Sequence, residues 1–202
     1  MFSNEIPQTD NVLLELGEPF IHAFIDAVAD ATDDYEEFRS WHPDWFATFA
    51  IRTAACFIHD RIWYHLVRRI EEMEDVVVLD KDPIRELRYQ SRYLLRVKRH
   101  NADDKITTYP TETALAFWSN GQKSLEGFES HSLALGYRWD SDMRSIGEAI
   151  LSYRTDLNTP IWSVTLERDA GQATGFTWTP IGPELPDLDL SSVLTEAEQG
   201  AS

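Results

Sequence analysis

The chain has 202 residues, of which 43% are hydrophobic and 12% aromatic, enough for one domain with a sizeable core. Thirty-five acidic and eighteen basic residues give a formal net charge of −17. This charge opposes non-specific binding to nucleic acid or to an anionic membrane and attracts a basic partner. The alternative interpretation is that the charge only keeps the protein soluble. No stretch approaches the ~20 apolar residues of a membrane helix, and the opening residues lack the order of a signal peptide. We therefore expect a cytoplasmic protein without a membrane partner.

Helices are predicted for the N-terminal part of the chain. Apolar residues recur at three- and four-residue spacings from about residue 12 to 38, which predicts one or two amphipathic helices with a candidate break at Gly17 and Pro19. A second helix is predicted to begin at Pro43 and to run without a breaker to Glu74. Its apolar stripe makes it the expected central packing element. The single cysteine, Cys56, lies in its apolar run AACFI, where we expect a packed small hydrophobic residue.

From residue 76 onward the pattern alternates, as is typical of strands. The candidates are VVVL at 76–79, one strand through ELRYQSRYLLRVKRH, and then SLALGYRW, SIGEAILSYR and PIWSVTLER, with a short helix at TETALAFW. The fold class is therefore α+β, with N-terminal helices packed on a mostly antiparallel sheet of about five strands. We expect one domain over residues 1–182, mainly helical to residue 75 and mainly strands after it, followed by a flexible acidic tail at 183–202.

The basic residues are concentrated in the middle of the chain. Residues 83–110 carry seven bases and three acids, whereas residues 1–82 carry eighteen acids and six bases. Alternation along the predicted strand 88–98 puts four cations on one face: Arg88, Arg92, Arg96 and Lys98. This face is a candidate for binding a partner or an anion such as phosphate. The alternative is internal neutralisation, because acids on neighbouring strands or on the N-terminal helices can pair with these cations.

His59 and Asp60 are the one weak candidate for a metal site. Adjacent residues of a helix point about 100° apart, and the upstream histidines and acids show no diagnostic ligand spacing. A surface pair, or a histidine packed beside Trp63, is the other interpretation. The sequence also lacks HExxH, GxxxxGK, GxGxxG and GxSxG, so no cofactor is expected and no catalytic residue is assigned.

Two functions from different classes follow from these observations. The first is a non-enzymatic inhibitor of the antitoxin, immunity or anti-restriction type, which binds a basic protein through its acidic surface and through Asp187 and Asp189 of the tail. The alternative is a metal-dependent phosphohydrolase or nuclease that uses His59 and Asp60, with Arg92, Arg96 and Lys98 as anion anchors. The sequence leaves open the partner, any enzymatic activity and the oligomeric state.

Overall fold

Four helices and seven strands follow one another in the computed structural model, which describes residues 6–81, 84–119, 130–139, 145–169 and 175–181. The helices are α1 (Thr9–Trp41), α2 (Pro43–Ala47), α3 (Ile51–Ile70) and α4 (Glu112–Trp118). The strands are β1 (Val76–Lys81), β2 (Ile84–Tyr89), β3 (Tyr93–His100), β4 (His131–Trp139), β5 (Ile146–Arg154), β6 (Pro160–Arg168) and β7 (Phe176–Pro180). The α+β prediction is confirmed, with seven strands rather than about five.

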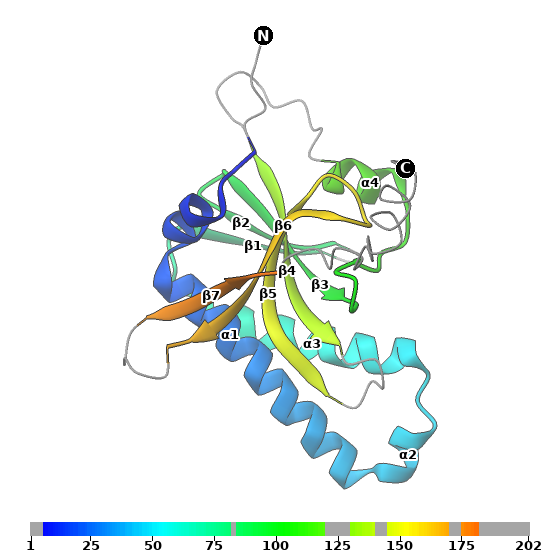
Figure 1. The fold of residues 1–202 in the computed structure, drawn as a ribbon. Coiled ribbons are helices and arrows are strands. Elements are labelled where there is room, and N and C mark those ends of the chain that lie inside the picture. The colour runs from blue at the N-terminus through cyan, green and yellow to red at the C-terminus, as the bar shows by residue number, and fades with distance from the viewer. Residues whose placement is uncertain (1–5, 82–83, 120–129, 140–144, 170–174, 182–202) are drawn as a thin grey trace, which may run out of the picture.

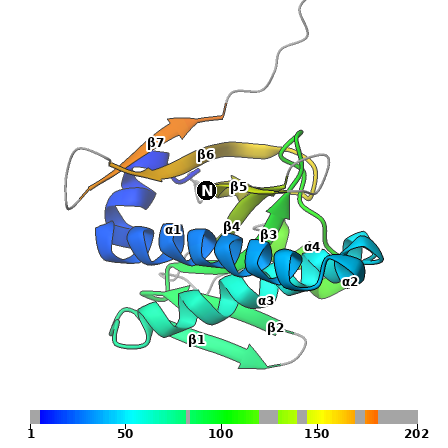
Figure 2. The same ribbon diagram turned by 90° about the horizontal axis from the view of Figure 1, so that it is seen from below.

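All seven strands form one sheet in the order β1-β2-β3-β4-β5-β6-β7. Every neighbouring pair is antiparallel except β3 and β4, which are parallel. A parallel pair cannot be joined by a tight turn, and the connection after β3 carries α4. The sheet curves around α1 and α3, with β1 and β2 on one side of these helices and β6 and β7 on the other (Figures 1 and 2).

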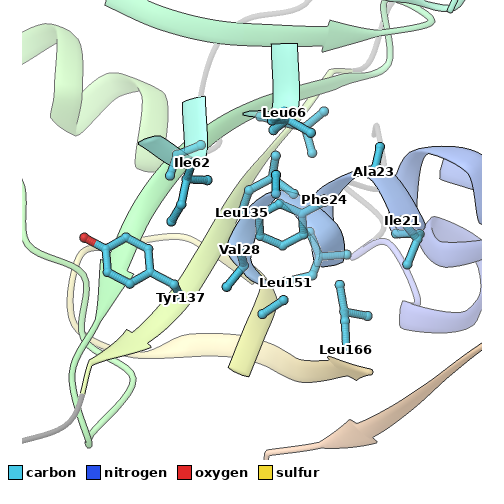
Figure 3. Packing of buried hydrophobic residues seen from close by; sticks show 14 of the residues in the cluster. Ile21, Ala23, Phe24, Val28, Ile62, Leu66, Leu135, Tyr137, Leu151 and Leu166 are labelled. Carbon is cyan, nitrogen blue, oxygen red and sulfur yellow. The ribbon is translucent and has the colours of Figure 1, made fainter. Parts of the chain in front are cut away.

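The main core lies between the two long helices and the concave face of the sheet (Figure 3). α3 contributes buried apolar residues at four-residue spacing, which lie on one face of the helix, and the strands contribute alternate residues. Buried members include Phe24, Val28, Ile58, Ile62, Leu66, Leu95, Leu135, Leu151 and Leu166. A smaller cluster on the opposite face of the sheet joins Phe117 and Trp118 of α4 to Ala134. The short predicted helix is confirmed, and its Thr111 hydroxyl caps it by accepting a hydrogen bond from the Ala114 amide.

α1 has its break where the sequence predicts one. Gly17 has φ = +72°, a left-handed conformation that L side chains rarely adopt, and Pro19 follows in the next turn. The helix continues past this kink to Trp41. None of the described helices combines the length and the apolar character needed to cross a membrane.

The prediction of one helix from Pro43 to Glu74 is wrong, because Thr48–Ala50 separates α2 from α3. The Thr48 hydroxyl donates a hydrogen bond to the Trp45 carbonyl at 2.8 Å. Such side-chain hydrogen bonds compete with the backbone hydrogen bonds that continue a helix. Phe46 packs edge-on against Tyr35 at 5.1 Å, and Phe49 stacks on Phe38 at 5.7 Å, measured between ring centroids. These contacts with α1 turn the chain at this point.

The single strand predicted through residues 88–98 is in fact a hairpin of β2 and β3. Gln90 and Ser91 form the turn with φ of 47° and 59°, and Tyr89 pairs with Tyr93. Paired residues of a hairpin point to the same face, so the alternation of side chains continues through the turn and hides it. The sequence reading also missed β7. The predicted tail at 183–202 lies outside the described residues.

Candidate functional site

Three of the four cations predicted to form a binding face are neutralised by acids instead. Arg88 donates to Glu86 at 3.1 Å, and Arg92 donates to Glu15 of α1 at 2.9 Å. Arg96 also donates to Glu86, at 2.9 Å, and its guanidinium lies 3.7 Å from the centre of the Phe117 ring. Internal neutralisation therefore accounts for the part of the basic segment that lies near the hairpin turn.

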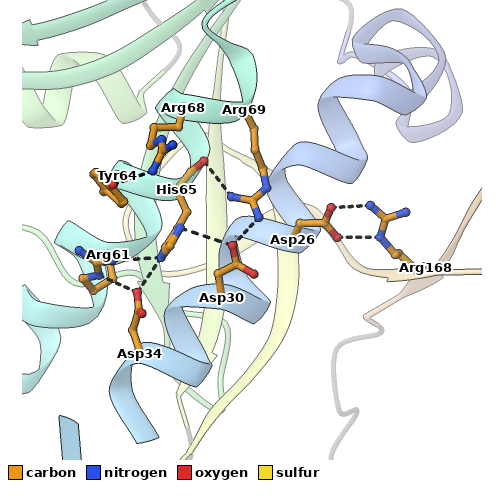
Figure 4. Close-up of polar contacts among 9 residues, drawn as sticks. All are labelled: Asp26, Asp30, Asp34, Arg61, Tyr64, His65, Arg68, Arg69 and Arg168. Atoms are coloured by element: carbon orange, nitrogen blue, oxygen red, sulfur yellow. Dashed lines mark hydrogen bonds and ion pairs between the residues drawn. The ribbon is translucent and has the colours of Figure 1, made fainter. Parts of the chain in front are cut away.

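Acids of α1 are likewise used in contacts with α3 and β6 (Figure 4). Asp26 pairs with Arg168, Asp30 with Arg69, and Asp34 with Arg61 and His65, at successive four-residue steps along the helix. The hydrogen bond from Arg168 lowers the pKa of Asp26. Burial acts to raise the pKa of Asp34, but hydrogen bonds from His65 and Arg61 outweigh it and lower that pKa. These acids hold elements together and are not free for a partner.

A groove opens where β2 and β3 separate. The two strands pair only between Leu87–Tyr89 and Tyr93–Leu95, and beyond these residues they diverge. A cavity of about 760 Å³ lies between them, walled by α3 and by residues 108–114. A second cavity of about 630 Å³ shares His59, Asp60, Val97 and Lys98 with it and extends along α3 to Ile51. We call the two together the α3–β3 groove.

The acids of the α3–β3 groove already have partners. Arg85 of β2 forms an ion pair with Asp60 and a longer one, of 3.3 Å, with Asp80. The indole N–H of Trp63 donates to the other oxygen of Asp80 at 2.7 Å. One arginine and one indole thus hold both carboxylates at the groove wall.

Three cations that line the same groove have no acid partner among the residues that the structure describes. Arg52, Lys98 and Arg99 form no ion pair with any acidic residue in the described part of the chain. The Lys98 ammonium is 3.5 Å from the Thr108 hydroxyl, and Arg99 donates to the Thr107 hydroxyl at 3.2 Å. The groove is therefore a cationic site in a strongly acidic protein.

Burial and charge repulsion affect the titratable groups of the groove. Burial, with a contribution from the nearby Arg96, lowers the pKa of Lys98 to about 8. Burial also lowers the pKa of His59, and the cations Lys98 and Arg85 act in the same direction. The lowered pKa favours the neutral imidazole, which has one ring nitrogen as a donor and one as an acceptor. The arrangement can offer a ligand both positive charge and neutral hydrogen-bonding groups.

The weak metal candidates His59 and Asp60 do meet the predicted anion anchors Arg96 and Lys98 in this groove. The imidazole lies 3.7 Å from the Asp60 carboxylate, which also receives Arg85. Within the described ranges, no three His, Cys, Asp or Glu side chains are grouped so that they could hold a metal ion. The metal-dependent reaction stays a prediction. Asp187 and Asp189 lie outside the described residues.

Cys56 is exposed and lines the groove, which contradicts the expectation of a packed residue. Ala54 and Ile58 of the run AACFI are buried, and Ala55 and Phe57 pack partly against the core. Cys56 lies on the outer face, because a helix directs one face outward even where its sequence is apolar throughout. The sequence reading also missed Arg52 and Arg99. Arg99 follows Lys98 directly and so points to the opposite face of β3, yet both residues line the second cavity.

The chain was compared with known proteins at three levels. No family model matches it, and neither a curated protein nor a solved structure does.

Proposed function

We propose that this protein binds a small organic anion in the α3–β3 groove, through Arg52, Lys98 and Arg99. The observation that carries the proposal is the contrast within the chain. In a protein of net charge −17, whose other arginines and histidines repeatedly pair with acids, three cations share one cavity without an acidic partner in the described ranges.

The energetics of Lys98 support this proposal. A partly buried ammonium without a counter-ion lowers stability, and its depressed pKa reports that cost. An anionic ligand would supply the missing counter-charge and raise this pKa again. Arginine side chains such as Arg52 and Arg99 bind carboxylate and phosphate groups through paired N–H donors. The expected anionic group is therefore a carboxylate or a phosphate.

The size and walls of the groove indicate the rest of the ligand. Cavities of about 630 and 760 Å³ lie within the range of roughly 300–1,000 Å³ that is usual for small-molecule sites. Ile84, Val97 and Ala114 provide apolar contact, and the hydroxyls of Thr107 and Thr108 provide neutral hydrogen bonds. An apolar or aromatic body that carries one anionic group fits this combination.

Calorimetric titration with a graded set of probes tests the proposal. We expect benzoate or phenyl phosphate to bind more tightly than acetate or inorganic phosphate, and the uncharged benzamide not to bind. Lys98→Gln should weaken binding at least about tenfold, because one charge-assisted contact is worth roughly 1.5–3 kcal/mol.

Lys105→Gln is the matched control. Lys105 is exposed and lines neither cavity, and its one ion pair within the described part of the chain is with Asp103 at 3.6 Å, so its replacement should leave binding unchanged. The proposal is wrong if none of the anions binds at millimolar concentration, or if the two lysine variants bind equally well.

A further inference from the structure

α1 and α3 form a helical hairpin whose tip contains α2. This tip carries an exposed aromatic surface that is separate from the cations of the α3–β3 groove. Trp41, at the end of α1, is 75% exposed, and Trp45, in α2, is 60% exposed. The His42 ring lies between them, 4.3 Å from each indole centroid, and is nearly parallel to Trp45 with an interplanar angle of 9°. We call these three residues the aromatic tip.

The fold does not require these two tryptophans. Their neighbours Tyr35 and Phe46 pack against the core, whereas neither Trp41 nor Trp45 belongs to it. α2 lies at the far end of the hairpin, away from the sheet, so the surface is open to a large partner (Figure 1). Tryptophan is a large apolar residue that proteins seldom leave this exposed, and it is enriched among the residues that dominate binding interfaces.

The charges around the aromatic tip are acidic. Residues 33–44 contain five acids and one base, Arg39. Asp34 pairs with Arg61, whereas Glu36, Glu37 and Asp44 are exposed and form no ion pair within the described residues. Indole faces attract ammonium and guanidinium groups, and neighbouring carboxylates strengthen this attraction. The same carboxylates repel nucleic acid and anionic lipid.

We propose that the aromatic tip binds a basic segment of a partner protein, with lysine or arginine side chains placed on the Trp41 and Trp45 rings and paired with Glu36, Glu37 and Asp44. This proposal gives the basic partner expected from the sequence a defined binding surface. It does not depend on the anion proposed for the groove, and either proposal can fail without the other.

The probe is a capped synthetic peptide of alternating arginine and leucine carrying a fluorescent label, and the readout is its anisotropy on titration with the full chain. We expect binding that weakens as salt is raised, because ion pairs contribute to it. Trp41→Ala/Trp45→Ala should weaken it at least about tenfold, since the change removes both exposed cation–π contacts together with the ring area that the peptide would bury. Glu36→Gln/Glu37→Gln/Asp44→Asn should weaken it similarly.

Matched variants separate this surface from general charge attraction. Glu71→Gln/Glu72→Gln/Glu74→Gln removes an equal number of negative charges just after the C-terminal end of α3, far along the chain from the aromatic tip. Tyr109→Ala removes a different aromatic ring, which is 83% exposed. Both should bind the peptide as the unmodified chain does. All variants should keep their thermal midpoints, because none of these side chains is buried.

Three results would overturn the proposal. The first is an equal loss of binding in both triple variants, which would reduce the effect to net charge. The second is unchanged binding in the double tryptophan variant. The third is that the aromatic tip binds a second copy of the chain or a membrane instead. A dimer, or binding to phosphatidylserine vesicles, that is lost in the Trp41→Ala/Trp45→Ala variant would show this.

Discussion

Replacing Lys98 by methionine should stabilise the fold at neutral pH. Burial lowers the pKa of the ammonium from 10.5 to about 8. A tenfold change in a proton-binding constant corresponds to about 1.4 kcal/mol, so the difference between a pKa of 10.5 and one of about 8 sets an upper bound of about 3.4 kcal/mol on the gain in unfolding free energy. Lys98 is only partly buried and solvent screens its charge, so we expect about 1–2 kcal/mol. Methionine keeps the unbranched stem and leaves no large cavity.

The pH dependence of this gain has a definite sign. The folded-state pKa lies below the unfolded value, so between about pH 8 and 10.5 the unfolded chain binds more protons at this residue than the folded chain. The stability of the unmodified chain relative to Lys98→Met should therefore rise across this window. The gain in the variant is full below about pH 8 and fades toward pH 10.5. Other groups that titrate there are common to both chains and cancel in the difference.

Urea unfolding at several pH values from 7 to 10.5 measures this difference. Lys105→Met serves as the control and should change the unfolding free energy by less than about 0.5 kcal/mol, because Lys105 is exposed. If Lys98→Met were no more stable than the unmodified chain at pH 7, burial of the Lys98 ammonium would not lower the free energy of unfolding. Lys98 would then have no unmet need for a counter-charge that an anion in the α3–β3 groove could supply.

Three further predictions concern the buried face of the sheet and the groove. A Cβ atom on Gly136 would lie 2.1 Å from the His100 ring, which is fully buried and hydrogen-bonded to Ser152, so Gly136→Ala should cost about 2–3 kcal/mol in urea unfolding. A cost below about 0.5 kcal/mol would contradict this packing. Burial, and after it Arg154, lowers the pKa of His100 to about 3. The neutral ring is therefore favoured by folding, and stability should fall as pH drops below about 6.5, by roughly 2 kcal/mol from this residue at pH 5. His100→Gln should lack this part of the pH slope, whatever its overall stability, and an identical slope would show that other groups cause it. Cys56 should react with a thiol reagent in the native protein without unfolding, since it is exposed, and an anion bound in the groove should slow the reaction. Labelling that requires denaturant would place the thiol elsewhere.

Local periodicity predicted most of the secondary structure. The four-residue spacing of α3, the break at Gly17 and the alternation of β4, β5 and β6 are all properties of neighbouring residues, and the structure confirms them. The errors arose where contacts between distant residues decide the conformation. The packing of Phe46 and Phe49 on α1 interrupts the long helix, and the turn at Gln90 and Ser91 preserves the alternation that would have revealed it.

The amino-acid sequence already shows that the chain is acidic, that it has a basic segment, and that this segment contains Lys98 and Arg99. Which of these charges are neutralised depends on how the elements pack in the fold. Arg92 meets Glu15, 77 residues away, and Arg85 meets Asp60, 25 residues away, whereas Lys98 meets no described acid. The physical reason is that periodicity reports how side chains are directed from one element. The balance of charge at a site depends on how several elements come together.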